Sequence, residues 1–300
     1  MGIGIELPPG QDTLKAHPKL EFESNGYAYS IERKDDASFY TVRDGAGSLT
    51  LPIQYAFGVS MQTFVLEREG RFYESLVSYY PSIGGLAVTM GSERMRPGNL
   101  VEAMGRETSN AEITACFNCH ATGAVREGAL RLDSLRPGLD CEHCHAGADD
   151  HMRALTGGKP GPIPSRLGRM TAEDTSTFCG QCHRTWDSVV RMRLWGQLNV
   201  RFQPYRLANS KRFLGNDRRI ACTACHNPHR DLVREDTGYD AKCLACHSTA
   251  AAASSSWKTC PVSKANCVSR HMPKVELPGG HSVFTDHTIR IAHVGGAYPD

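Results

Sequence analysis

Apolar and polar side chains alternate over short runs in the first third of the chain, which is the period of a half-buried β-strand. Turn sequences such as Asn25-Gly26 and Glu69-Gly70 separate these runs. The pattern predicts strands at residues 27–32, 38–42, 49–57, 63–67, 72–80 and 86–90. We therefore expect a small antiparallel β domain over residues 20–97, preceded by an irregular, proline-rich arm over residues 1–19.

Beyond Pro97 the apolar positions take helical spacing. Residues 99–108 and 171–197 have this periodicity, and the second stretch opens with Thr171-Ala-Glu-Asp174, a capping sequence. Connections rich in glycine and proline separate such stretches, and the small residues at 248–256 indicate an exposed loop. We expect residues 98–300 to be helical or irregular with little regular secondary structure, so the predicted fold class is α+β.

One five-residue pattern, Cys-x-x-Cys-His, occurs five times between residues 116 and 247. With 12 cysteines and 13 histidines in 300 residues, a random order would contain ~0.02 copies. The copies are Cys116-Phe-Asn-Cys119-His120, Cys141-Glu-His-Cys144-His145, Cys179-Gly-Gln-Cys182-His183, Cys222-Thr-Ala-Cys225-His226 and Cys243-Leu-Ala-Cys246-His247.

This pattern predicts five covalently bound haem c groups. Two thiols three positions apart reach the two vinyl groups of a porphyrin, and the next residue places an imidazole under the iron. A zinc site, an iron–sulfur site or a redox dithiol also uses paired cysteines, but none of them requires histidine directly after the second cysteine. The predicted proximal iron ligands are His120, His145, His183, His226 and His247.

The second axial ligand decides between electron transfer and catalysis, because two histidines close an iron to substrates. Eight histidines lie outside the proximal positions, enough to fill every sixth position. Methionine is the rival ligand, and only Met272 stands out. Spacing alone does not assign a distal histidine. The candidates, in order of preference, are His151, His229, His287, His281, His17, His293 and His143.

Charge and hydropathy limit the partners and the cellular location that the sequence allows. The chain has a formal net charge of +2, so no nucleic-acid partner is indicated. No apolar run is long enough to span a membrane. Haem c is attached outside the cytoplasmic membrane, so we expect an exported, periplasmic or extracellular protein. Residues 1–10 lack the basic and apolar regions of an export signal, so we expect that signal to lie outside this chain.

Two cysteines, Cys260 and Cys267, lie outside the five motifs and allow two interpretations. They could form a disulfide, which an oxidising compartment permits. Alternatively, Cys267 makes a single thioether and His271 binds a sixth haem, although Arg270 stands where the second cysteine of a motif would be. Six haems with two imidazoles each would need 12 of the 13 histidines. Both interpretations remain open at the sequence level.

The motifs and their surroundings resemble the multihaem c-type cytochromes related to cytochrome c554, and most closely an exported bacterial group with a β-rich segment before the haems. The resemblance covers residues from about 50 to 290. It implies closely stacked bis-histidine haems, with His151 and His229 at distal positions. Relatives carry Cys-x-x-Cys-His-Met-Pro in the tail, where this chain has Arg270. The residues that carry this resemblance are Cys141-Glu-His-Cys144-His145 with His151, Phe178-Cys-Gly-Gln-Cys-His183, Cys222-Thr-Ala-Cys-His-Asn-Pro-His229, and His271-Met-Pro-Lys with Phe284-Thr-Asp-His287.

The sequence therefore predicts an electron carrier rather than an enzyme, with redox proteins or copies of itself as partners. Copies could polymerise into an extracellular conductive filament if His17 on the N-terminal arm reached a haem of the next subunit. The alternative is a nitrite, hydroxylamine or sulfur-oxyanion reductase with one open haem. No Cys-x-x-Cys-Lys occurs and every motif ends in histidine, which favours the carrier.

Overall fold

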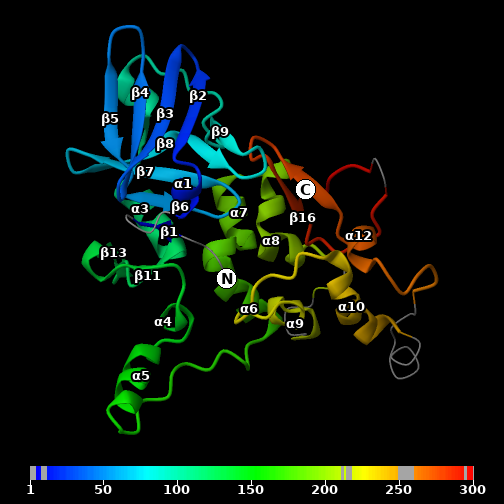
Figure 1. Ribbon diagram of the computed structural model, residues 1–300. Helices are drawn as coiled ribbons and strands as arrows, with labels where there is room; N and C mark the ends of the chain where they lie inside the picture. The colour runs from blue at the N-terminus through cyan, green and yellow to red at the C-terminus, as the bar shows by residue number, and fades with distance from the viewer. Residues whose placement is uncertain are drawn as a thin grey trace. The chain divides into compact units, whose positions relative to one another are not determined.

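The computed structural model describes residues 5–7, 12–210, 213, 218–248, 260–293 and 296–299. The chain forms two compact units (Figure 1). The N-terminal unit comprises the residues up to Arg166 together with Gly279–Ser282, and the C-terminal unit comprises Leu167–Pro278 and Val283–Asp300. Helices and antiparallel sheets are both present, which confirms the α+β class.

Four strands of the N-terminal unit form one antiparallel sheet in the order β2-β3-β4-β5 (Figure 1). Its first hairpin turns at Asn25 and Gly26, whose φ angles of 52° and 80° match the turn that suits a two-residue hairpin loop. The strands are β2 (Lys19–Ser24), β3 (Tyr27–Lys34), β4 (Ala37–Arg43) and β5 (Ser48–Pro52).

A second, six-stranded sheet of this unit has the order β1-β6-β7-β8-β10, with β9 paired to β8. Gly105 in β10 is required by a close approach, because a Cβ atom there would lie 2.2 Å from the carbonyl oxygen of Glu74. The strands are β1 (Ile5–Glu6), β6 (Tyr55–Phe57), β7 (Gln62–Arg68), β8 (Arg71–Tyr80), β9 (Gly85–Val88) and β10 (Gly105–Glu107).

The predicted strands are present, but two details of the prediction are wrong. Residues 19–24 form a strand that was not predicted. The run predicted at 49–57 divides into β5 and β6, which belong to different sheets, so there are two sheets instead of one. Pro52, which has no amide donor, ends β5, and Ile53 behind it is fully buried.

Residues from both sheets share one hydrophobic core. The alternate side chains that point inward include Tyr29, Tyr40, Phe64 and Leu76, each at most 2% exposed. Burial of this apolar area is the main stabilising contribution to the unit. A second cluster packs the helix α3 (Asn110–His120) against Phe57 through Ile113 and Phe117.

The rest of the N-terminal unit consists of short helices and two-residue strands. The helix predicted over residues 99–108 is shorter than expected, because the chain leaves α2 (Leu100–Met104) at Gly105 and joins the sheet as β10. The other elements are α1 (Asp12–Ala16), β11 (Ala121–Thr122), β12 (Val125–Arg126), β13 (Ala129–Leu130), η1 (Leu132–Ser134), β14 (Arg136–Pro137), α4 (Cys141–Cys144) and α5 (Ala148–Thr156).

Among its described residues, the C-terminal unit forms short helices and a pair of antiparallel strands. Thr171 caps α6 (Ala172–His183) through a reciprocal pair of hydrogen bonds with Asp174, as its sequence predicts. The predicted helix does not continue to residue 197, because Arg184 has a φ of 61°. The other elements are α7 (Trp186–Met192), η2 (Gly196–Arg201), α8 (Gln203–Ala208), η3 (Arg218–Ile220), α9 (Cys222–Cys225), η4 (Asp236–Tyr239), α10 (Asp240–His247), α12 (Cys267–His271), β15 (Lys274–Leu277) and β16 (Ser282–Thr285).

The predicted domain boundary and one predicted loop stay predictions. The boundary at residue 97 marks a change of composition, whereas the compact units divide at residue 166. The exposed loop predicted at 248–256 lies, apart from Ser248, outside the described residues. In the part of the chain that the structure describes, no helix combines the length and the apolar character needed to cross a membrane.

Candidate functional site

All five Cys-x-x-Cys-His motifs lie at the C-terminal ends of helices. The helices α3, α6 and α10 end at the histidine of their motif, whereas α4 and α9 end at the second cysteine and the histidine follows. Residues three positions apart lie on the same face of a helix. Each motif therefore presents its two thiols on one face, next to its histidine. Two motifs lie in the N-terminal unit and three in the C-terminal unit.

The first motif is fixed by a capped and well-packed helix. Ser109 and Glu112 form a capping box at the start of α3. At the other end, the Phe117 ring packs edge-on against Phe57 at 5.1 Å, and the Phe57 ring lies 5.2 Å from the ring of His120. The buried face of α3 thus sets the position of the histidine, while both cysteines of the motif remain partly exposed.

The second motif and the predicted ligand His151 lie on adjacent helices, α4 and α5. The Glu142 carboxylate accepts hydrogen bonds from the backbone amides of Gly147 at 3.0 Å and of Asp149 at 2.8 Å. These bonds fix the turn between the two helices. Those two amides lower the pKa of the Glu142 carboxyl. The region is therefore locally ordered, although His145 and His151 are only partly buried.

The imidazole rings of His145 and His151 are each oriented by a hydrogen bond to a backbone carbonyl. The Nδ1 atom of His145 lies 2.8 Å from the carbonyl oxygen of Ser165, and that of His151 lies 2.8 Å from the carbonyl oxygen of Pro162. A carbonyl oxygen can only accept, so each Nδ1 carries a hydrogen and Nε2 is the nitrogen left to bind a metal ion. Metal-bound histidines use this arrangement to fix the ring and its tautomer.

In the C-terminal unit the structure brings the predicted ligand His287 to the fourth motif. The rings of His226 and His287 lie 6.1 Å apart, centre to centre, with an angle of 34° between their planes. The Nδ1 atom of His287 donates to the carbonyl oxygen of Thr285 at 2.9 Å. Removal from water lowers the pKa of His287 to about 4, so this ring is neutral at pH 7.

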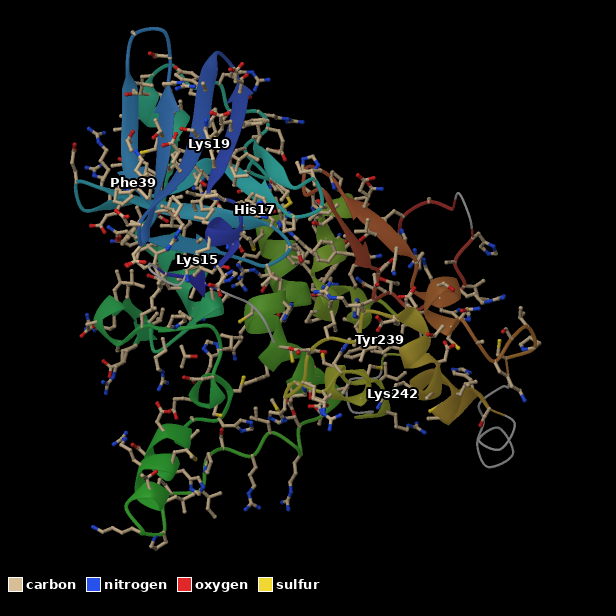
Figure 2. All side chains as sticks on the ribbon, in the orientation of Figure 1. Lys15, His17, Lys19, Phe39, Tyr239 and Lys242 are labelled. Carbon is tan, nitrogen blue, oxygen red and sulfur yellow. The ribbon has the colours of Figure 1, made fainter. Side chains whose placement is uncertain are left out.

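Tyr239 orients the other ring of this pair. Its hydroxyl donates to the carbonyl oxygen of Val233 at 2.9 Å and therefore accepts from Nδ1 of His226, at 3.4 Å. Tyr239, labelled in Figure 2, is the last residue of η4, and α10 begins at the next residue. Burial is also the main cause of the lowered pKa of His226. Both rings of the pair thus have an occupied Nδ1 and a neutral form.

A buried ion pair holds the segment that carries His287. Nε of Arg206 donates to Oδ1 of Asp286 at 2.8 Å, and Nη2 donates to Oδ2 at 3.1 Å. The two side chains are 1% and 0% exposed. Ser210 continues this support, because its hydroxyl donates to the carbonyl oxygen of His287 at 3.1 Å.

Thiols of different motifs approach one another in the C-terminal unit. A hydrogen bond with the Cys179 thiol is the main cause that lowers the pKa of Cys222 to about 7. Burial, with Cys267 nearby, raises the pKa of Cys243 to about 12. The third motif thus lies beside the fourth, and the fifth lies beside the tail cysteine. No disulfide joins Cys260 and Cys267 in the structure.

Three other predicted distal ligands have different surroundings. His229 is exposed, and its backbone amide donates to Oδ1 of Asn227. His281 is exposed at the turn of the β15–β16 hairpin, with its ring 4.8 Å from that of Tyr80. Nε2 of His17, labelled in Figure 2, is 2.6 Å from the hydroxyl of Tyr79. Their assignment as ligands stays a prediction.

The donor set fits a haem c. Paired thiols lie on one helix face, and the oriented histidines have Nδ1 engaged in a hydrogen bond, which leaves Nε2 as the atom that would bind iron. The roles of Tyr239, Arg206 and Asp286 were not predicted from the sequence. A backbone carbonyl acceptor leaves no signal in a sequence, and a tyrosine or an arginine outside a motif has no spacing that would mark it.

One protein-family model matches part of the chain. Residues 89–146, which include the first two motifs, match the family of cytochrome c554 and c-prime. The predicted resemblance to cytochrome c554 is thereby confirmed. The solved structure of the outer cell wall cytochrome OcwA matches with 20% identity and a TM-score of 0.29, over 44% of this chain and 26% of that one. This chain therefore spans about a quarter of the length of OcwA. No curated protein matches.

Proposed function

We propose that this chain is an exported cytochrome that passes electrons along a row of closely stacked haem c groups, each held between two histidines. The match to the cytochrome c554 family supports a c-type cytochrome in electron transfer. The five motifs support five covalent haems, and this cofactor supports a location outside the cytoplasm. Redox proteins are the proposed partners.

The pairing of His226 with His287 carries this proposal. Two imidazoles that bind one metal ion from opposite sides, each through a bond of about 2 Å, have ring centres roughly 6 Å apart. The observed separation is 6.1 Å. His226 is the motif histidine, so His287 is the proposed sixth ligand of the same iron. An iron with both axial positions filled is closed to substrates.

The surrounding residues keep the two rings in place during electron transfer. A haem bound here would accept and release one electron at its iron. Thr285 and Tyr239 hold the Nδ1 hydrogens, so neither ring rotates or takes up a proton when the charge changes. The buried pair of Arg206 and Asp286 fixes the backbone next to His287. Such rigidity keeps the reorganisation energy of each electron transfer small.

The reductase alternative requires an iron with one open axial position. At the fourth motif that position is the one that His287 would fill. An open haem would therefore have to lie at another motif. We propose that the chain is a carrier, not an enzyme.

The filament alternative requires His17 to bind a haem of another copy. The Nε2 atom that would bind the iron is hydrogen-bonded to Tyr79, so this bond would have to break first. The carrier needs no such change. We therefore propose redox proteins, in preference to copies of the chain, as its partners.

Replacement of His287 tests this proposal. His287→Ala should leave one iron with a single imidazole, so the reduced variant should bind carbon monoxide at one haem per chain. Ser282→Ala is the matched control, because Ser282 lies in the same tail and carries no side chain that binds haem iron. We expect no carbon monoxide complex in the control. A His287→Ala variant that binds none would refute the assignment of His287.

A further inference from the structure

The tail segment Cys267–His271 has the backbone of a haem motif. It forms the single helical turn α12, which ends at His271, just as α3, α6 and α10 end at the histidines of intact motifs. Cys267 occupies the place of the first motif cysteine, and Arg270 occupies that of the second. The segment thus keeps the spacing between a thiol and an imidazole that the other five motifs have.

The ring of His271 is oriented like that of a proximal ligand. Its Nδ1 atom lies 2.9 Å from the carbonyl oxygen of Arg290, which matches the 2.8 Å contact between His145 and Ser165 in the second motif. The amide of Arg290 in turn donates to the carbonyl oxygen of His271 at 3.0 Å. These two hydrogen bonds fix the ring and put a hydrogen on Nδ1, so Nε2 is the nitrogen left to bind a metal ion.

The position of Cys267 is fixed by a second set of contacts. Its amide donates to Oδ1 of Asp240 at 2.8 Å, and the amide of Asn266 donates to Oδ2 at 2.8 Å. Asp240 is the first residue of α10, the helix of the fifth motif. The Cys267 thiol is also within hydrogen-bonding reach of Cys243 in that motif. The tail thiol is therefore held beside an intact haem motif.

Arg270 does not obstruct this site. The residue is exposed, so its guanidinium can stay in water while the helical turn around it keeps its shape. Its effect is chemical: without a thiol at this position, one of the two usual thioether bonds cannot form.

We propose that Cys267 and His271 hold a sixth haem through a single thioether. The inference rests on the proposed function, because the same export and haem attachment must supply the group. The Cys267 S–H bond adds across one vinyl double bond, with sulfur bonding to the carbon next to the ring and hydrogen to the terminal carbon. No electrons are gained or lost overall. The second vinyl group stays intact, and Nε2 of His271 binds the iron.

Mass spectrometry of the intact holoprotein tests this site. A digest that leaves residues 260–274 in one peptide should show a haem adduct on Cys267 and an alkylatable thiol at Cys260. Pyridine haemochrome absorbance should give six haems per chain. Five haems together with a Cys260–Cys267 disulfide, or with two alkylatable thiols, would overturn the inference and leave the proposed function intact. Fewer than five haems would instead contradict the proposed function.

Three variants separate attachment from folding. Cys267→Ser should lower the count from six haems to five, whereas Cys260→Ser should keep six. Arg270→Cys restores a complete motif, so it should keep six haems and shift the absorption band of the tail peptide to the wavelength of haems with two thioethers. A rise from five to six in Arg270→Cys would show that the natural chain carries no haem there, and would overturn the inference.

Discussion

Single hydrogen bonds set the histidine orientations on which the proposed haem ligation depends. His145, His151, His271 and His287 each direct Nδ1 to a backbone carbonyl at 2.8–2.9 Å. The acceptor for His145 is the carbonyl oxygen of Ser165, 20 residues further along the chain. Residue type and spacing predicted which histidines are ligand candidates. They could not predict how a ring is oriented, because every residue carries a carbonyl.

Glu112 provides a test at the residue scale. The amide and hydroxyl of Ser109, followed by Arg106, lower its carboxyl pKa to about 2 from an ordinary value of 4.5. Its stabilisation is therefore fully present above pH 4.5 and is lost as the pH falls towards 2. Glu112→Gln should reduce the free energy of unfolding at pH 7 by about 0.5–1 kcal/mol, a small effect because the side chain is half exposed.

Chemical denaturation at two pH values measures this effect. The difference between the natural chain and Glu112→Gln should be smaller at pH 3 than at pH 7. Glu127→Gln is the control, since Glu127 is exposed, and it should change neither value. A pH-independent difference would show that the capping box of α3 does not depend on the charge of Glu112.

At the scale of elements, the sequence predicted most strands but not their division into two sheets. The alternation of apolar side chains over residues 49–57 continues through Pro52, so this alternation alone does not show that β5 and β6 are separate strands. The predicted helix over residues 171–197 breaks at Arg184, because a left-handed backbone conformation of a non-glycine residue leaves no sequence signal. The capping sequence at Thr171 is local, and there the prediction was confirmed.

The segment that carries His287 depends on the buried pair of Arg206 and Asp286. Asp286→Ala leaves the buried Arg206 guanidinium without its carboxylate partner, which should cost about 3–5 kcal/mol of unfolding free energy. The backbone next to His287 should also loosen, so we expect one haem of the reduced variant to bind carbon monoxide.

Glu74→Ala is the matched control for this variant. Glu74 pairs with Arg106 at 3.1 Å, but the two side chains are 33% and 42% exposed, so the loss should stay below about 1 kcal/mol. Denaturation midpoints and carbon monoxide titration of both variants give the comparison. Equal losses in the two variants would contradict the role given to Asp286.

At the scale of the whole molecule, the sequence indicates the cofactor, and the structure shows which residues lie around the motif histidines. The five motifs indicate haem c because thioether chemistry fixes the spacing of their residues. The proposed distal ligands come from distant parts of the chain: the ring of His287 lies beside that of His226 although 61 positions separate them in the sequence. Such pairs follow from tertiary structure, which no local pattern encodes.

Carbon monoxide binding to the intact natural protein tests the central claim most directly. If every haem is held between two histidines, the fully reduced protein should form no carbon monoxide complex, and the oxidised protein should show only low-spin ferric haem. A stoichiometric carbon monoxide complex would reveal an open iron. That result would contradict the electron carrier and favour the reductase.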